Sequence, residues 1–280
     1  MPANQKLMPE EVRQLGVLFI TMHEGDRSML DYNHQRSFSQ QVCELIDQAL
    51  DTERAAQVPR SYLGASRLGA PCERVLQYEY AKASVDEGRG FSGRTLRIFE
   101  VGHIFEDLVI RWLRLAGFEL HNRKANGDQF GFSVAGGRLK GHVDGVITSA
   151  PAALGLRFPM LFECKTMADK HWRACARSGV AATKPVYAAQ VATYQAYMES
   201  AVEGISRNPA LFVAVNKDTQ ELLLELLAFD APLAQRMSDR AIKVITATEA
   251  GELLPRAYTA GTHFECRMCA WQDRCWSAQK

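Results

Sequence analysis

Two hydrophobic patterns alternate along this chain of 280 residues. Apolar residues recur every three or four positions, as on one face of a helix, in five stretches: 9–22, 35–56, 97–116, 186–201 and 231–250. In the second stretch, Phe38, Leu45 and Ile46 belong to a predicted packing face, and in the third the expected apolar stripe includes Ile98, Val101 and Leu115.

Short apolar or alternating runs, typical of strands, occupy the segments between the later helices. QFGFSV and RLKGHVDGVI flank Ala135-Gly136-Gly137 and predict one hairpin; LFVAVN and ELLLELLAF flank Lys217-Asp218 and predict another. Phe158–Lys165 is predicted to be the central strand. Helices interleaved with strands predict an α/β fold with a central mixed sheet flanked by helices, plus an N-terminal helical lobe.

The stretch from Gly141 to Thr166 carries the strongest candidate chemistry. Asp144 falls on one predicted strand, and Glu163 and Lys165 lie on the same face of the next, because side chains two apart on a strand point to one side. Two converging carboxylates suit a hard cation such as Mg²⁺ or Mn²⁺. A lysine beside them would stabilise the charge of a phosphoryl group, so the set predicts phosphodiester hydrolysis. An ordinary surface hairpin with a Glu/Lys pair is the alternative.

A strand ending in Asp144, about twenty residues, and an apolar strand ending in E-C-K resemble the PD-(D/E)xK nuclease superfamily. Gln190 and Tyr194 in Q-V-A-T-Y resemble the Q-x3-Y motif of its RecB-like and phage-exonuclease branches. The resemblance implies a restriction-endonuclease-like core over residues 61–280, with residues 1–60 as a separate N-terminal helical region. It further implies that Gln190 orients the substrate or the attacking water and that Tyr194 touches the DNA backbone.

In G-H-I-F-E, Glu106 follows Gly102 by one helical turn, which resembles the G-x3-E helix of phage exonucleases. The resemblance implies that Glu106 is the third carboxylate of the metal site, with Asp144 and Glu163. RecB-like relatives from CRISPR-adaptation and helicase-nuclease families have a histidine at that point of the helix. Here His103 stands next to the glycine instead, so it is the weaker candidate. For Glu106, an ordinary solvent-facing helix glutamate is the alternative.

The C-terminal segment FECRMCAWQDRCW places Cys266, Cys269 and Cys275 within ten residues. Three thiols leave a metal site one ligand short, and Cys72 at a predicted helix start is the obvious fourth. One cysteine from the N-terminal side and three from the C-terminus resemble the iron-sulfur staple of the AddB and CRISPR-adaptation nucleases. The spacing favours a [4Fe-4S] cluster, with a structural Zn²⁺ as the alternative. Cys164 and Cys175 fall outside the pattern.

Composition and charge are compatible with the predicted nuclease. The net charge is +1, but residues 89–140 carry nine Lys/Arg against five Asp/Glu, beside the candidate site. Neither an apolar run long enough for a membrane span nor a secretory leader is visible, so we expect a cytoplasmic protein. Seven cysteines in that reducing compartment predict metal binding rather than disulfides.

These observations together predict a metal-dependent DNA exonuclease of the phage-recombination or end-processing type. Its partners would be DNA ends, with a homo-oligomer, a helicase or an annealing protein as further possibilities. Two other classes remain open. A non-catalytic DNA-binding or assembly subunit could retain the fold and the cluster, and a glycosidase could use Asp144 and Glu163 as acid and base without any metal.

Overall fold

A computed structural model describes residues 36–277, so the predicted helix at 9–22 lies outside the described residues. The chain divides into two compact units, Met1–Glu44 and Leu45–Lys280. The first described helix, α1 (Phe38–Ala56), forms where the periodicity predicts it. Its expected packing face does not form, because none of its residues is buried and Phe38 and Leu45 are largely exposed.

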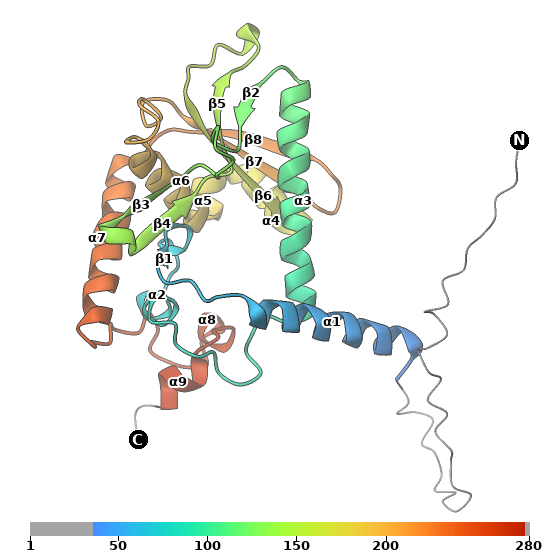
Figure 1. Ribbon diagram of the computed structural model, residues 1–280, viewed down its shortest axis with the longest axis vertical. Coiled ribbons are helices and arrows are strands. Elements are labelled where there is room, and N and C mark those ends of the chain that lie inside the picture. Colours follow the sequence, from blue (N-terminus) through green and yellow to red (C-terminus); the bar gives the residue numbers. More distant parts are fainter. Residues whose placement is uncertain (1–35, 278–280) are drawn as a thin grey trace, which may run out of the picture. The chain divides into compact units, whose positions relative to one another are not determined.

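A five-stranded mixed sheet is the centre of the second unit (Figure 1). Its order is β2-β5-β6-β7-β8, and only β6 and β7 run parallel. The interior strand β7 is buried on both faces, which explains its unbroken apolar run. The strands are β2 (Glu119–His121), β5 (Gly145–Ser149), β6 (Met160–Met167), β7 (Ala210–Asn216) and β8 (Leu222–Leu227).

Helices cover both faces of this sheet, so the predicted α/β architecture with a mixed sheet is confirmed. One face packs against α3 (Gly93–Leu115) through residues such as Phe162 and Val213. The opposite face packs against α6 (Pro185–Met198), and α7 (Ala231–Glu249) lies beside α6. The short helices α4 (Asp169–Ser178) and α5 (Val180–Thr183) connect β6 to α6.

The apolar stripe predicted for α3 is only partly correct. Val109, Ile110 and Leu113 are the residues that this helix buries against the sheet, with Phe105 and Trp112 packed beside them. Ile98 and Val101 are exposed, because the N-terminal half of the helix extends beyond the part that contacts the apolar sheet face. Leu115, the last residue of the helix, is exposed as well.

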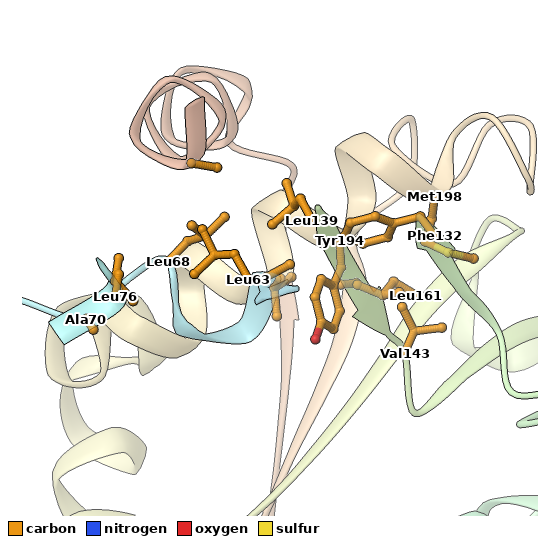
Figure 2. Packing of buried hydrophobic residues seen from close by; sticks show 14 of the residues in the cluster. Leu63, Leu68, Ala70, Leu76, Phe132, Leu139, Val143, Leu161, Tyr194 and Met198 are labelled. Carbon is orange, nitrogen blue, oxygen red and sulfur yellow. The ribbon is translucent and has the colours of Figure 1, made fainter. Parts of the chain in front are cut away.

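A smaller sheet has the order β1-β4-β3 and lies against α6. The hairpin from β3 (Gly131–Val134) through η4 (Ala135–Gly137) to β4 (Leu139–His142) is confirmed, with two glycines at positive φ in its turn. A two-residue strand, β1 (Leu63–Gly64), pairs in parallel with β4 and leads into η3 (Ala65–Arg67). Figure 2 shows how Leu63, Leu139, Phe132 and Tyr194 pack between these elements.

The remaining described elements lie at the C-terminal end and in two connections. They are α2 (Glu73–Tyr80), η5 (Ala152–Leu154), α8 (Phe264–Arg267) and α9 (Gln272–Ser277). Within residues 36–277, no helix is long and apolar enough to cross a membrane.

Candidate active site and cysteine cavity

Strand β6 presents Glu163 and Lys165 on the face that packs toward α6, while Phe162 and Cys164 enter the core under α3. The alternation of the strand therefore places the two charged side chains side by side, as the sequence predicts. Glu163 is completely buried, and its Oε1 atom forms an ion pair with the Lys165 ammonium. The Lys165 ammonium also lies 5.7 Å from the centre of the Tyr187 ring.

Asp144 reaches the same site from a position that the sequence did not predict. Instead of lying within a strand, it occupies the short break between β4 and β5, where the chain passes from the small sheet to the large one. Its Oδ2 atom accepts a hydrogen bond of 2.8 Å from the backbone N–H of Cys164. That bond anchors the carboxylate beside β6, so the break itself delivers the second acidic group.

Glu106 joins this group from α3. Gly102 lies one turn before it. A Cβ atom added at Gly102 would be in ordinary contact with the Thr166 hydroxyl on β6, so the helix approaches the strand closely at this point. His103 is largely exposed, and its Nδ1 atom lies 3.9 Å from Glu106 Oε2. The structure therefore brings Glu106 toward Asp144 and Glu163, with His103 at the outer edge.

Helix α6 contributes Gln190 and Tyr194 from the side opposite α3. The Gln190 amide donates a 2.5 Å hydrogen bond to Glu163 Oε1. Tyr194 is buried, with its ring edge-to-face against Phe132 and its hydroxyl paired with Ser66. Because only 3% of Tyr194 is exposed, this packing does not present it to a DNA backbone. Its position suits holding the site's geometry.

The carboxyl groups strongly perturb one another. Burial, and then the charge of Asp144, raise the pKa of Glu163 to about 8 and the pKa of Glu106 to about 7. Burial also raises the pKa of Asp144. For Lys165, burial opposes the charged form, but Glu163 and Asp144 outweigh it and raise the pKa of the ammonium. The single lysine does not neutralise three carboxyl groups.

One carboxylate oxygen at the centre of the site has no partner. Glu163 Oε2 is fully buried and accepts no hydrogen bond, which is costly for a charged oxygen. The donor set of three carboxyl groups fits a hard divalent cation, and such a cation would satisfy that oxygen. Among residues 36–277, however, no three His, Cys, Asp or Glu side chains are already spaced as a formed metal site.

The four cysteines singled out in the sequence line one cavity of about 300 Å³. Cys72 directly precedes α2, Cys266 lies in α8, Cys269 follows α8, and Cys275 lies in α9. Apolar and aromatic side chains, including Tyr78 and Trp271, complete the wall. Cys164 and Cys175 are buried elsewhere, outside the cavity, as the sequence predicts.

Hydrogen-bond donors point at two of these sulfurs. The Trp271 backbone N–H lies 3.4 Å from the Cys269 sulfur, and the Arg74 guanidinium lies 3.8 Å from that of Cys275. Such donors stabilise thiolate sulfur, which is the form that binds metal. Burial raises the pKa of the Cys266 and Cys269 thiols, and the other cysteines add to that effect. The donor set thus fits a thiolate-bound metal group.

Two contributors to the candidate active site were not assigned a role from the sequence. Ser66 in η3 pairs with the Tyr194 hydroxyl, and Tyr187 lies beneath the Lys165 ammonium. Ser66 lies in a segment whose apolar residues follow neither a helical nor a strand spacing, so no sequence pattern indicated its role. The spacing of Tyr187, three residues before Gln190 on the same helical face, was visible.

The structure thus combines a mixed sheet flanked by helices with a cluster of three carboxyl groups and a lysine on one side of that sheet. No protein-family profile matches the chain, and no curated protein is significantly similar in sequence. Among solved structures, an alkaline exonuclease (LHK-Exo) from Laribacter hongkongensis is 14% identical, with a TM-score of 0.46, covering 74% of this chain and 93% of that one. Its complex with dAMP gives 13% identity, a TM-score of 0.45, and coverage of 68% and 89%. A protein designated SSO0001 is 15% identical, with a TM-score of 0.44, covering 85% and 98%.

Proposed function

We propose that this protein is a metal-dependent deoxyribonuclease that hydrolyses phosphodiester bonds from DNA ends. The observation that carries the proposal is the fully buried Glu163, whose Oε2 atom has no partner while Lys165 and two further carboxyl groups converge on it. A folded protein keeps such an arrangement at a cost in stability. A bound divalent cation and a phosphate would relieve that cost.

Glu106, Asp144 and Glu163 are the residues that would hold Mg²⁺ or Mn²⁺. When bound, the cation would polarise a phosphoryl oxygen and lower the pKa of a bound water. The bond from the Cys164 backbone fixes the Asp144 carboxylate, and Gln190 fixes that of Glu163. These contacts hold two of the three ligands in place, Asp144 in the break between β4 and β5 and Glu163 within β6.

Lys165 would stabilise the negative charge that develops on the phosphoryl oxygens, because its ammonium is kept charged beside the carboxylates. Gln190 would also orient the substrate or the attacking water. We assign Tyr194 a positioning role, since it is buried and contacts Ser66 and Phe132. His103, exposed at the rim beside Glu106, would contact the substrate or assist the metal.

Cys72, Cys266, Cys269 and Cys275 would hold a [4Fe-4S] cluster, with a structural Zn²⁺ as the alternative. The support is their shared cavity and the donors aimed at the sulfurs. Such a group would tie the C-terminal segment to α2 and close residues 61–280 into one nuclease domain, with residues 1–60 as an N-terminal region. Metal analysis of protein purified without oxygen would distinguish iron and sulfide from zinc.

The experiment that tests the catalytic proposal is cleavage of end-labelled linear and circular DNA by anaerobically purified protein, with and without Mg²⁺. The wild type should shorten linear DNA only with metal and should leave closed circles intact. Lys165→Ala should bind DNA but lose cleavage by orders of magnitude. If neither protein cuts any DNA with Mg²⁺ or Mn²⁺, the catalytic proposal fails and the non-catalytic binding subunit replaces it.

A further inference from the structure

The outer face of the small sheet carries cations that the proposed active site does not use. Along β4, Leu139 and Gly141 point inward, where a side chain at Gly141 would collide with Phe132 and Tyr194. Lys140 and His142 therefore point outward, and His142 is exposed. This face continues along β1, because Gly64 is the register partner of Lys140.

Two cations on this face share one aromatic ring. The Lys140 ammonium lies 5.0 Å from the centre of the Tyr62 ring, and the Arg60 guanidinium lies 6.0 Å from the same point. Gly64 lies beside this pair, since a Cβ atom added there would be in ordinary contact, at 3.5 Å, with the Arg60 guanidinium. The arrangement places two positive charges around one aromatic ring.

Neither charge is neutralised by another residue of the segment 36–277. Within the part of the chain that the structure describes, Arg60 and Lys140 form no ion pair, and their donors bond to no carboxylate. The neighbouring Arg67 differs, because Glu79 binds its guanidinium through both carboxylate oxygens. Two cations held close together without an acidic partner repel each other, and an anion between them would remove that repulsion.

The position of the face indicates which anion it binds. Lys140 lies in β4 four residues before Asp144, and four residues of chain span at most roughly 14 Å. The phosphates of one DNA strand are spaced by about 3.4 Å along a duplex, so this distance is a few nucleotides. A DNA strand whose scissile phosphate lies at Asp144 and Glu163 would pass its neighbouring phosphates over Lys140 and Arg60.

We propose that Arg60, Tyr62 and Lys140 form a binding site for backbone phosphates of the substrate strand, a few nucleotides from the bond that is cleaved. This inference rests on the proposed function for the path of the strand. Lys140 and Arg60 bind phosphate oxygens, and the Tyr62 ring holds the two cations in place. The site recognises the sugar-phosphate backbone and carries no base specificity.

Binding without cleavage tests this site directly. The full-length protein in EDTA is titrated into a fluorescently labelled single-stranded DNA, and its anisotropy is followed at several salt concentrations. Lys140→Ala and Arg60→Ala should each weaken binding several-fold and each reduce the slope of log affinity against log salt by about 0.7. Arg236→Ala, which removes an exposed cation from α7, should leave the slope unchanged.

The possible outcomes separate this inference from the proposed function. If the wild type cleaves DNA but Lys140→Ala and Arg60→Ala keep the wild-type slope, the phosphate site is refuted and the nuclease assignment stands. If the wild type binds DNA with the predicted loss in both variants but never cleaves it, the phosphate site stands and the catalytic proposal fails. Circular dichroism of each variant confirms that a lower affinity does not reflect unfolding.

Discussion

Replacing the buried Glu163 by glutamine should stabilise the metal-free protein while abolishing its activity. The pKa of this carboxyl rises from the ordinary value of 4.5 to about 8 in the folded protein. At ~1.4 kcal/mol for each tenfold change in an equilibrium constant, ionising Glu163 costs the folded state about 4 kcal/mol at pH 8. That figure already contains the favourable attraction of Lys165.

The sign of the pH dependence follows from the two protonation states. Below pH 4.5 the carboxyl is protonated in both the folded and the unfolded chain, so it adds no pH-dependent cost. Between 4.5 and about 8 the unfolded chain releases the proton while the folded protein retains it, so stability falls as pH rises. An amide at this position does not titrate, and Glu163→Gln should lose this part of the pH dependence.

The assay is chemical denaturation of wild type and Glu163→Gln at pH 5.5 and pH 8, each in EDTA and in Mg²⁺. In EDTA the variant should be at least as stable as the wild type at pH 8, by up to about 4 kcal/mol. Mg²⁺ should stabilise the wild type and leave the variant unchanged, because only the wild type retains the full ligand set. A variant that is several kcal/mol less stable in EDTA at pH 8, or that gains as much from Mg²⁺, would refute the reasoning.

The carboxyl groups, the cysteine cavity and the contact of Gly69 with α6 each lead to a further prediction. Mg²⁺ affinity, measured by calorimetry, should rise steadily from pH 6 to pH 9, because protons compete for Glu106 and Glu163, whose pKa values are about 7 and about 8; an affinity independent of pH would contradict this. Cys269→Ala should lower the melting temperature and the visible absorbance of anaerobically purified protein, whereas Cys43→Ala, which removes an exposed thiol, should change neither. Gly69→Ala should destabilise the fold by about 1–3 kcal/mol in denaturant titrations, since its Cβ would lie 2.8 Å from the backbone of Val186.

Local periodicity predicted most of the helices and strands. Within the candidate site, it predicted the side-by-side placement of Glu163 and Lys165 and the helical face that carries Gln190. The pairing of Glu163 with Lys165 on one face of β6 follows from the alternation of a strand, whatever surrounds it. The helical spacing of Tyr187, Gln190 and Tyr194 likewise predicted one face of α6, and Gln190 does reach Glu163 from it.

Other features depended on which surfaces meet. The predicted stripe on α3 included Ile98 and Val101, but only the turns that contact the sheet bury their apolar residues. Asp144 lies between two sheets because β4 and β5 pair with different partners, and no single-strand pattern contains that information. The same holds for Tyr194, whose burial comes from Phe132 and the small sheet.

The sequence by itself therefore determined the periodicity of side chains along each helix and strand. It also determined which residue types can carry chemistry: the acidic and basic groups of β6 and the four cysteines. Only the tertiary structure decided which of those groups converge. About two hundred residues separate Cys72 from Cys266, yet both line one cavity. The physical reason is that the alternation of side chains is fixed by local backbone geometry, whereas proximity between distant segments is fixed by the burial of their apolar faces against each other.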